Sequence, residues 1–227
     1  MNRRTVLKLA ELSLFVFPKV VKLEEYSPLE DYCKIEELDL INIKKDVYIT
    51  IDDGPRKDFN SIFDKLKEND KFTFFMLGCL LNTEKGYYSA CKTLEKGHTI
   101  GNHSYNHPSF SSINIDKAKS EIERTHNFIT KIYSDVGVKP EFVFRFPYGD
   151  PGFQVIKKQE RIIHTGSPTK KEEINNFLNS LGYKSYFWDV DTEDWRYYAH
   201  SRSLNSVLNR IKNTKNNDVV LMHEFPI

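Results

Sequence analysis

Short runs of β-branched and aromatic residues alternate with amphipathic segments along the chain after about residue 45. This alternation is typical of a parallel sheet or barrel whose neighbouring strands are joined by crossover helices. The predicted strands are residues 47–51, 72–77, 98–102, 142–144, 186–190 and 219–222. The sequence therefore predicts an α/β fold, and in such folds ligands bind beyond the carboxyl ends of the parallel strands.

Apolar residues at helical spacing predict the helices that connect these strands. The expected helical segments are residues 59–66, 118–132, 168–178 and 204–211. Asp116 is the expected N-cap of the second segment, with Gly137 near its end. Ser167 followed by Pro168 predicts the start of the third, because a cap residue and a first-turn proline favour a helix N-terminus.

No repeat, low-complexity tract or linker divides the 227 residues, so we expect one domain over residues 46–227 with an N-terminal extension over residues 1–45. The extension combines an early basic pair with a later apolar run, which resembles a twin-arginine export signal. Lys8 and Glu11 interrupt that run, so a short helix docked on the domain stays the alternative. No stretch reaches the roughly 18 to 20 apolar residues of a membrane span, and an exported or cell-envelope location is favoured over the cytoplasm.

The charge balance argues against a polyanionic partner. Thirty-three basic and 32 acidic residues leave a formal net charge of +1, so the composition gives nucleic-acid binding no support. The three cysteines, Cys33, Cys79 and Cys91, include no closely spaced pair, and we expect mostly buried thiols rather than a cysteine metal site. Nothing in the sequence indicates an oligomeric state.

Two aspartates, Asp52 and Asp53, stand side by side where the first predicted strand ends. Adjacent carboxylates repel each other and are costly to desolvate, so we expect a cation or a metal close to the pair to compensate. A solvated turn is the alternative, because Asp-Gly-Pro is ordinary turn chemistry. Successive residues of an extended strand point in opposite directions, so one aspartate can bind a metal while its neighbour faces the substrate water.

Two histidines follow the third predicted strand. His103 and His107 are four residues apart, a spacing that can place two metal ligands on one face of a helix. Pro108 disfavours helical backbone at His107, so a loop at the strand end is the stronger expectation. Together with one aspartate, the two imidazoles form a ligand set for a catalytic divalent metal with open positions for water and substrate. A pair of unrelated histidines is the alternative.

Further polar or aromatic residues follow the later strands. They are Arg145, Tyr148, Asp191, Asp194, Trp195 and His223. Arg145 and a metal are expected to favour the ionised form of the aspartate that does not bind the metal, which can then act as a base. Structural alternatives are an ion-pair role for Arg145, an N-cap role for Asp191 or Asp194 and a core position for Trp195.

Five motifs occur in order between about Val47 and Glu224. They read TIDDGP, HSYNH, RFPYG, DTEDW and LMH. In this combination the chain resembles the polysaccharide deacetylases with a NodB-homology domain, carbohydrate esterase family four. The resemblance implies a distorted (β/α) barrel and a metal-dependent hydrolase that removes N-acetyl groups from polysaccharide containing N-acetylglucosamine, such as peptidoglycan, a chitin-like chain or another surface glycan. Zinc is the first expectation for the metal, with cobalt or another divalent ion as alternatives.

The resemblance also implies roles at the reacting centre. Asp52 matches the catalytic base. The metal ligands are matched by Asp53, His103 and His107. Arg145 matches the arginine that contacts the base.

The remaining roles concern the leaving amine and the acetyl group. His223 matches the general acid, and Asp194 matches the aspartate that holds and tunes it. The backbone N–H of Tyr148 matches a donor to the oxyanion. Trp195 and Leu221 match the walls of the acetyl pocket, although either could also be a core residue.

The chain departs from the family pattern at three places. Ile51 stands where an aromatic residue is usual, and Glu224 stands where aspartate is common. The sequence ends at Ile227, where family members continue with a helix that covers the last strand. The domain is therefore expected to lack that helix, or to use the N-terminal extension as its cover.

Rival functions keep the fold and change the chemistry. A carbohydrate-binding protein derived from a deacetylase ranks second, because Asp52 and His223 are both present and a binding protein is expected to lose one of them. A related amidohydrolase that acts on a small or lipid-linked amide is a further alternative. A structural zinc protein is disfavoured, because a closed zinc site needs a fourth protein ligand that is not evident.

Overall fold

The computed structural model describes residues 21–22, 46–56, 59–63, 66, 70–158 and 161–224. The predicted N-terminal extension lies outside these residues, except for the short strand β1 (Val21–Lys22), which pairs antiparallel with β2. No helix among the described residues combines the length and the hydropathy needed to cross a membrane. Cys79 and Cys91 are free and only partly buried, whereas Cys33 lies outside the described residues.

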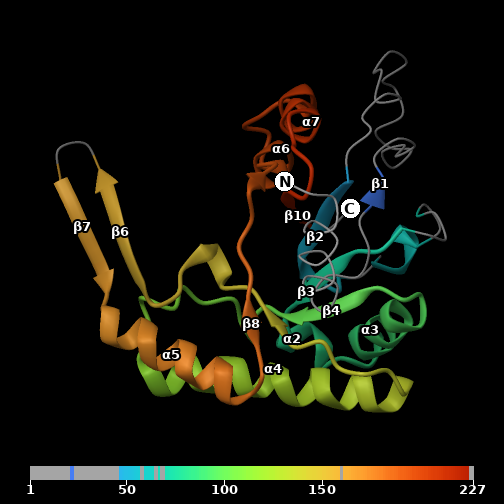
Figure 1. Ribbon diagram of the computed structural model, residues 1–227, viewed down its shortest axis with the longest axis horizontal. Coiled ribbons are helices and arrows are strands. Elements are labelled where there is room, and N and C mark those ends of the chain that lie inside the picture. Colours follow the sequence, from blue (N-terminus) through green and yellow to red (C-terminus); the bar gives the residue numbers. More distant parts are fainter. Residues whose placement is uncertain are drawn as a thin grey trace, which may run out of the picture.

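Seven of the described strands run parallel in one sheet, in the order β8-β5-β4-β3-β2-β10-β9 (Figure 1). Their bounds are Asp46–Gly54 (β2), Thr73–Met76 (β3), Thr99–Asn102 (β4), Val143–Phe144 (β5), Lys184–Ser185 (β8), Val190–Asp191 (β9) and Val219–His223 (β10). This arrangement confirms the predicted α/β fold. It brings strands that are far apart in the sequence, β2 and β10, next to each other inside the sheet.

The sheet is curled, because its two edge strands are consecutive in the sequence. β8 and β9 lie at opposite edges, yet only residues 186–189 join them. The chain from Ser185 to Val190 can span at most about 18 Å, so the edges must approach each other. The result is the predicted distorted barrel, and residues 186–189, called the strap below, bridge its open side. The prediction of one strand over 186–190 is wrong, because the strap connects two strands instead of continuing one.

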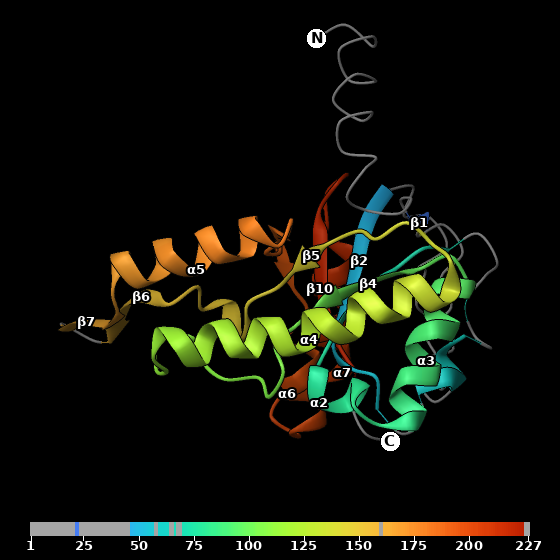
Figure 2. The ribbon, with the colours of Figure 1, turned by 90° about the horizontal axis from the view of Figure 1, so that it is seen from below.

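Helices pack against the sheet and cover it (Figure 2). Their bounds are Gly78–Leu81 (α2), Glu84–Glu95 (α3), Ile115–Val136 (α4), Pro168–Ser180 (α5), Asp194–Tyr198 (α6) and Leu204–Lys212 (α7). The long helix α4 packs against α5 along one part and against α3 along the other, whereas α6 and α7 lie at the other end of the sheet, near β10 (Figure 1).

The predicted helix boundaries are mostly confirmed. α5 begins after the N-cap Ser167, and α7 matches the expected segment 204–211. The N-cap of α4 is Asn114, whose side chain accepts a hydrogen bond from the backbone N–H of Lys117, so the assignment of Asp116 as the cap is wrong. In the expected helix over 59–66, the structure describes only a 3-10 helix, η4 (Phe59–Ile62).

The core between the sheet and the helices is rich in aromatic rings. Phe74 on β3 lies 5.1 Å from Phe59 and 6.2 Å from Phe72, measured between ring centroids, and all three side chains are buried. A second cluster, around Phe144 and Phe146, lies under α4 and α5. These two clusters hold the carboxyl ends of β2 to β5 in fixed positions, and the candidate site lies at those ends.

An antiparallel hairpin stands out from the body of the molecule (Figure 1). It consists of β6 (Phe153–Lys158) and β7 (Arg161–Gly166). The sequence did not predict it, because Val155 and Ile156 are consecutive apolar residues and do not show the alternation of a half-buried strand.

Candidate active site

A bulge at the end of β2 separates the two adjacent aspartates. The register with β3 shifts between Asp52 and Gly54, and Asp53 has a φ of 72°. A bulge redirects a side chain, and a non-glycine residue with positive φ is strained, so this feature is typical of a functional position. Asp52 remains in register with His223 on β10, and its side chain is buried.

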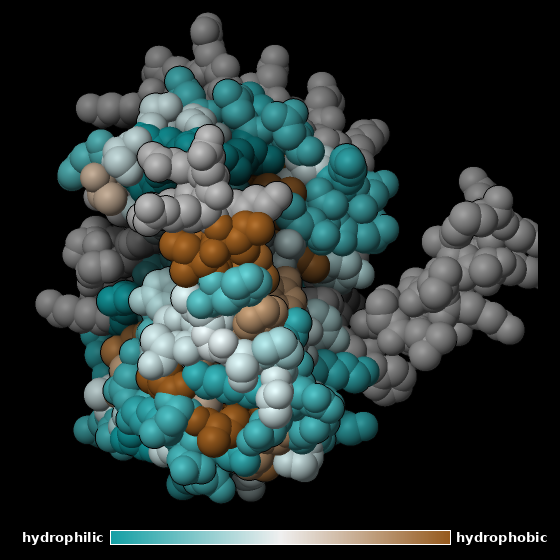
Figure 3. Space-filling view, turned by 90° about the vertical axis from the view of Figure 1, so that its left-hand side faces the viewer, coloured by the Kyte–Doolittle hydropathy of each residue, from teal (hydrophilic) through white to brown (hydrophobic). Residues whose placement is uncertain are grey.

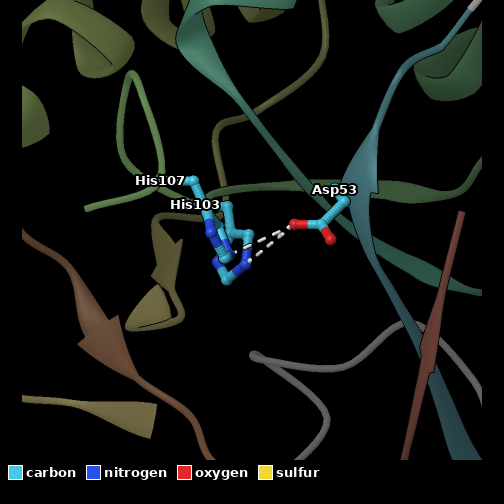
Figure 4. Close-up of side chains that lie close together, drawn as sticks. All are labelled: Asp53, His103 and His107. Carbon is cyan, nitrogen blue, oxygen red and sulfur yellow. Dashed lines mark ion pairs between the residues drawn. The ribbon is translucent and has the colours of Figure 1, made fainter. Parts of the chain in front are cut away.

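The loop that follows β4 carries the two histidines, as predicted, and is not helical. Ser104 and His107 have φ values of 67° and 61°. The side chain of Asn102 accepts a hydrogen bond from the N–H of Ser104, and the hydroxyl of Ser104 accepts one from the N–H of His107. These local bonds hold the strained loop so that both imidazoles point toward Asp53 (Figure 4).

The three predicted metal ligands lie together, with both histidines directed at one carboxylate oxygen of Asp53. Asp53 Oδ1 lies 3.5 Å from His103 Nε2 and 3.3 Å from His107 Nε2. This oxygen is buried and has no hydrogen-bond donor among the described residues. A buried oxygen without a donor is costly, and a cation placed among the three atoms removes that cost.

The protonation of the histidines fits a metal. His103 Nδ1 donates a hydrogen bond to the Arg145 carbonyl over 2.8 Å, which leaves the lone pair of Nε2 directed at Asp53. Burial lowers the pKa of His103 to about 3 and also lowers the pKa of His107. Both imidazoles are therefore neutral at pH 7. One carboxylate and two neutral imidazoles form a donor set that zinc accepts, and the partial exposure of Asp53 and His107 leaves one side open.

The second aspartate, Asp52, has different partners. Its Oδ1 accepts a hydrogen bond from Arg145 over 3.0 Å, and its Oδ2 lies 3.6 Å from His103 Nε2. Burial raises the pKa of Asp52 above its ordinary value, and the nearby Arg145 and His223 lower it without cancelling that effect. Arg145 thus acts in the expected direction, but burial is the larger influence. A carboxylate with a raised pKa is a stronger proton acceptor, which suits a general base.

Arg145 connects Asp52 to the strap through hydrogen bonds. Its guanidinium is fully buried and donates to Thr50 and Asp52 on β2 and to the carbonyls of Tyr186 and Phe187 in the strap. The guanidinium also lies 4.3 Å from the ring centre of Phe75. This one side chain, directly after β5, therefore joins β2 to the strap that bridges the two sheet edges.

His223 and Asp194 form a pair beside this cluster. His223 Nδ1 lies 2.8 Å from Asp194 Oδ1, and the backbone N–H of His223 donates to Asp194 Oδ2. Burial lowers the pKa of His223, but the hydrogen bond and the charge of Asp194 outweigh it, so the pKa is raised overall. The N-cap of α6 is Glu193, so neither Asp191 nor Asp194 has the proposed cap role, and Asp194 faces the histidine instead.

The other predicted residues lie around these groups. Tyr148 has a φ of 58°, and its ring centre is 4.5 Å from that of His107. Trp195 directly follows Asp194 and is 47% exposed. Leu221 is buried two residues before His223, on the same face of β10. Trp195 and Leu221 are thus placed next to the histidine–aspartate pair.

Sequence reasoning missed Glu121, which holds the histidine loop. This buried carboxylate on α4 accepts hydrogen bonds from the backbone N–H groups of Tyr105 and Asn106 and from the Asn106 side chain. A signal was present, because Glu121 lies on the apolar stripe of α4 beside Ala118 and Ile122. An acid on such a stripe is rarely buried without a partner.

Sequence reasoning also missed two carboxylates that support the ends of β2 and β9. Glu224 accepts a hydrogen bond from the N–H of Arg56, and its own N–H donates to the carbonyl of Asp52. Glu193 forms ion pairs with three arginines, Arg196, Arg202 and Arg210, which fix the chain immediately before Asp194. The glutamate at position 224 therefore has a structural task in this chain.

The fold and the site define a class. A curled parallel sheet with a candidate mononuclear metal centre, a buried aspartate beside it and a pair formed by His223 of β10 and Asp194 of α6 is an arrangement that can support metal-dependent hydrolysis.

The comparisons with known proteins identify the family. The family model described as "Polysaccharide deacetylase" matches residues 41–165, which is more than half of the chain. The chain belongs to the polysaccharide deacetylase family. This finding confirms the predicted family.

Three relatives place the chain more closely. It is 33% identical over 185 residues to the peptidoglycan-N-acetylglucosamine deacetylase of Bacillus cereus, an alignment that covers 81% of this chain and 57% of that protein. It is 28% identical over 211 residues to the peptidoglycan-N-acetylmuramic acid deacetylase PdaC of Bacillus subtilis, covering 90% of this chain and 38% of that protein. The solved structure of a family 4 carbohydrate esterase from Streptomyces lividans, in complex with acetate, has a TM-score of 0.59 at 25% identity and covers 79% of both chains. The chain thus spans little more than half of the first curated relative, and less of the second.

Proposed function

We propose that this protein is a metal-dependent deacetylase that hydrolyses the N-acetyl groups of N-acetylglucosamine units in peptidoglycan. The observation that carries the proposal is the convergence of Asp53, His103 and His107 on one buried oxygen without a donor, with Asp52 beside them and His223 in register on the next strand. The choice of glycan is supported by the names of the relatives, since both curated relatives described above are peptidoglycan deacetylases. The catalytic domain is proposed to cover residues 46–227.

The proposed metal, zinc first and cobalt or another divalent ion second, is held by Asp53, His103 and His107. When bound, such an ion polarises the amide carbonyl and lowers the pKa of a water molecule. The neutral Nε2 atoms of the two histidines supply lone pairs, and the hydrogen bond from His103 Nδ1 to Arg145 fixes the orientation of that ring.

Asp52 is proposed as the base that removes a proton from the attacking water. Its Oδ1 is held by Arg145, so Oδ2, which faces the histidine side of the site, is the oxygen that takes the proton. Water adds to the acetamide carbonyl carbon, and the backbone N–H of Tyr148 is the proposed donor to the developing oxyanion. Trp195 and Leu221 are proposed to form the walls around the acetyl methyl group.

His223 is proposed as the acid that completes the reaction. Because Asp194 holds Nδ1, the Nε2–H of the imidazolium is the proton that passes to the sugar nitrogen. The carbon–nitrogen bond then breaks, and the products are acetate and a glucosamine residue. The raised pKa of His223 keeps the acid protonated toward neutral pH.

The test measures acetate released by the purified chain from peptidoglycan glycan strands and from N-acetylglucosamine oligomers. Release that stops with a chelator and returns with zinc or cobalt is the expected result. Mass spectrometry of the digested glycan then shows which sugar has lost its acetyl group, since the relatives named above act on different sugars. A folded, metal-loaded protein that releases no acetate from any of these substrates would overturn the proposal in favour of a carbohydrate-binding role or another amide substrate.

A further inference from the structure

The β6–β7 hairpin exposes branched aliphatic side chains on both of its faces. Ile156 is paired with Ile163, and these two side chains are 42% and 41% exposed on one face. Val155 and Ile162, which are 53% and 59% exposed, lie on the other face, because neighbouring strand residues alternate. The side of the molecule that carries the hairpin shows a hydrophobic patch between polar surroundings (Figure 3).

The turn end of the hairpin is basic in sequence. Residues 157–161 contain Lys157, Lys158 and Arg161 against a single acid, Glu160. The register pairs Lys158 with Arg161, so this charge belongs to the end farthest from the body. The whole chain is nearly neutral, with a net charge of +1, so the concentration of positive charge at this point is local.

The backbone is constrained at the end of the hairpin that joins the body of the molecule. Gly152 and Gly166 have φ values of 98° and 72°, and a Cβ on Gly166 would collide with the carbonyl oxygen of Gly152. Ser167, which caps α5, donates its N–H to that same carbonyl. The rings of Phe153 and His164 stack at 5.9 Å between centroids. The hairpin is therefore a defined projection joined directly to a helix.

These features together select one kind of partner. A protein surface can cover one face of a projecting hairpin, but the interfacial layer of a bilayer covers both faces at once. Apolar side chains with flanking lysine and arginine are the composition that binds such a layer when its lipids are anionic. Strands of six residues reach only about 20 Å, so the hairpin can enter the headgroup region, where its unpaired backbone groups stay hydrated, but cannot span the bilayer. We infer that the β6–β7 hairpin docks the protein on an anionic membrane surface.

The experiment is sedimentation of the full chain with vesicles. One set contains phosphatidylglycerol and phosphatidylcholine, and the other contains phosphatidylcholine alone. The variant Ile156→Ser/Ile162→Ser removes one aliphatic side chain from each face and should lower the partition coefficient at least about ten-fold. The variant Lys157→Gln/Lys158→Gln should lower it about five-fold per residue on the anionic vesicles. The control Lys85→Gln/Tyr88→Ser changes exposed residues of α3 and should bind as the wild type does.

Three results would overturn the inference. The first is that both hairpin variants bind vesicles as well as the wild type does. The second is that the wild type binds both sets of vesicles equally. The third is that the wild type binds no vesicles and forms a dimer in analytical ultracentrifugation, which the isoleucine variant converts to a monomer. The last result would show that a second copy covers the hairpin. The vesicle assay does not depend on catalysis, so it stands or falls separately from the deacetylase proposal, and both variants should keep wild-type acetate release from soluble oligomers.

Discussion

At the scale of single residues, Asp52 and Asp53 are distinguished by backbone conformation. The positive φ of Asp53 and the bulge around it turn its carboxylate toward the two imidazoles, while Asp52 stays in register and meets Arg145. The strand alternation expected from the sequence would also separate the two side chains, but it would not place Asp53 in the left-handed conformation. The repulsion of two adjacent carboxylates is relieved because each one has its own positive or neutral partners.

The proposed base, Asp52, and a proposed metal ligand, His103, should therefore respond differently to substitution. Asp52→Asn should still bind the metal, but its rate of acetate release should fall about 10²-fold or more, because only the proton acceptor is removed. His103→Ala should lose both, because a ligand is removed. Metal content by elemental analysis and acetate release check both variants, with Asp46→Asn at the exposed start of β2 as the control. Metal-loaded Asp52→Asn with normal activity would exclude Asp52 as the base.

The pair formed by His223 and Asp194 predicts a pH dependence. The proposed acid must be protonated, so activity falls as pH rises through the pKa of His223. Asp194 raises that pKa, and Asp194→Asn removes the negative charge, so the alkaline limb of the kcat/KM profile should move to lower pH. The rate on the alkaline side should fall about tenfold for each pH unit by which that limb moves, because the protonated fraction of His223 falls by that factor.

The pH profile of Asp116→Asn, an exposed residue in the first turn of α4, is the control. The acidic limb should keep its position in both variants, because Asp194 does not contact Asp52. An alkaline limb that stays in place in Asp194→Asn would show that His223 is not the acid.

At the scale of elements, α4 supports the histidine loop through Glu121. Glu121→Ala leaves the N–H group of the buried residue Tyr105, and that of Asn106, without this acceptor, so it should lower the free energy of unfolding by about 1–3 kcal/mol. It should also weaken metal binding, by up to about tenfold, because the loop that carries His103 and His107 loses its anchor on α4. Chelator competition and chemical denaturation measure the two effects. Glu123→Ala, exposed on the same helix, is the matched control, and equal metal affinity in both variants would contradict the role of Glu121.

The elements also show how far the sequence could be interpreted. Strands such as β2 and β10, and helices such as α5 and α7, were predictable because their apolar periodicity agrees with their burial. The grouping of Asp53, His103 and His107 at the strand ends was predictable because strands of a parallel sheet bring their carboxyl ends together.

The features that sequence did not predict depend on contacts between distant segments. The bulge at Asp53 depends on the register with β3, and the function of Glu121 depends on a loop fifteen residues away along the chain. Residues 186–190 have the composition of one strand, so the sequence does not predict the break between β8 and β9. That break follows from the closure of the barrel. The β6–β7 hairpin is exposed on both faces, so it lacks the periodicity that burial produces.

At the scale of the whole molecule, Arg145 joins the parts that curl the sheet. Its buried guanidinium contacts β2 through Thr50 and Asp52, and contacts the strap through two carbonyl oxygens. The strap and the proposed base are thus held by the same side chain. Stability and catalysis are expected to be coupled at this position.

Arg145→Met tests that coupling. The substitution leaves Asp52 buried without its cation, so it should lower the free energy of unfolding at pH 7 by about 3–5 kcal/mol and raise the pKa of Asp52 further. In the double variant Arg145→Met/Asp52→Asn neither residue of this pair carries a charge, so its loss of stability should be smaller than that of Arg145→Met alone. Chemical denaturation of the single and double variants measures the difference. The same cycle at Lys131 and Asp135, an exposed pair on α4, should show little coupling, because water screens it. A double variant that is less stable than Arg145→Met would mean that the contacts of Arg145 with the strap, and not its charge pair with Asp52, dominate its contribution to the closed barrel.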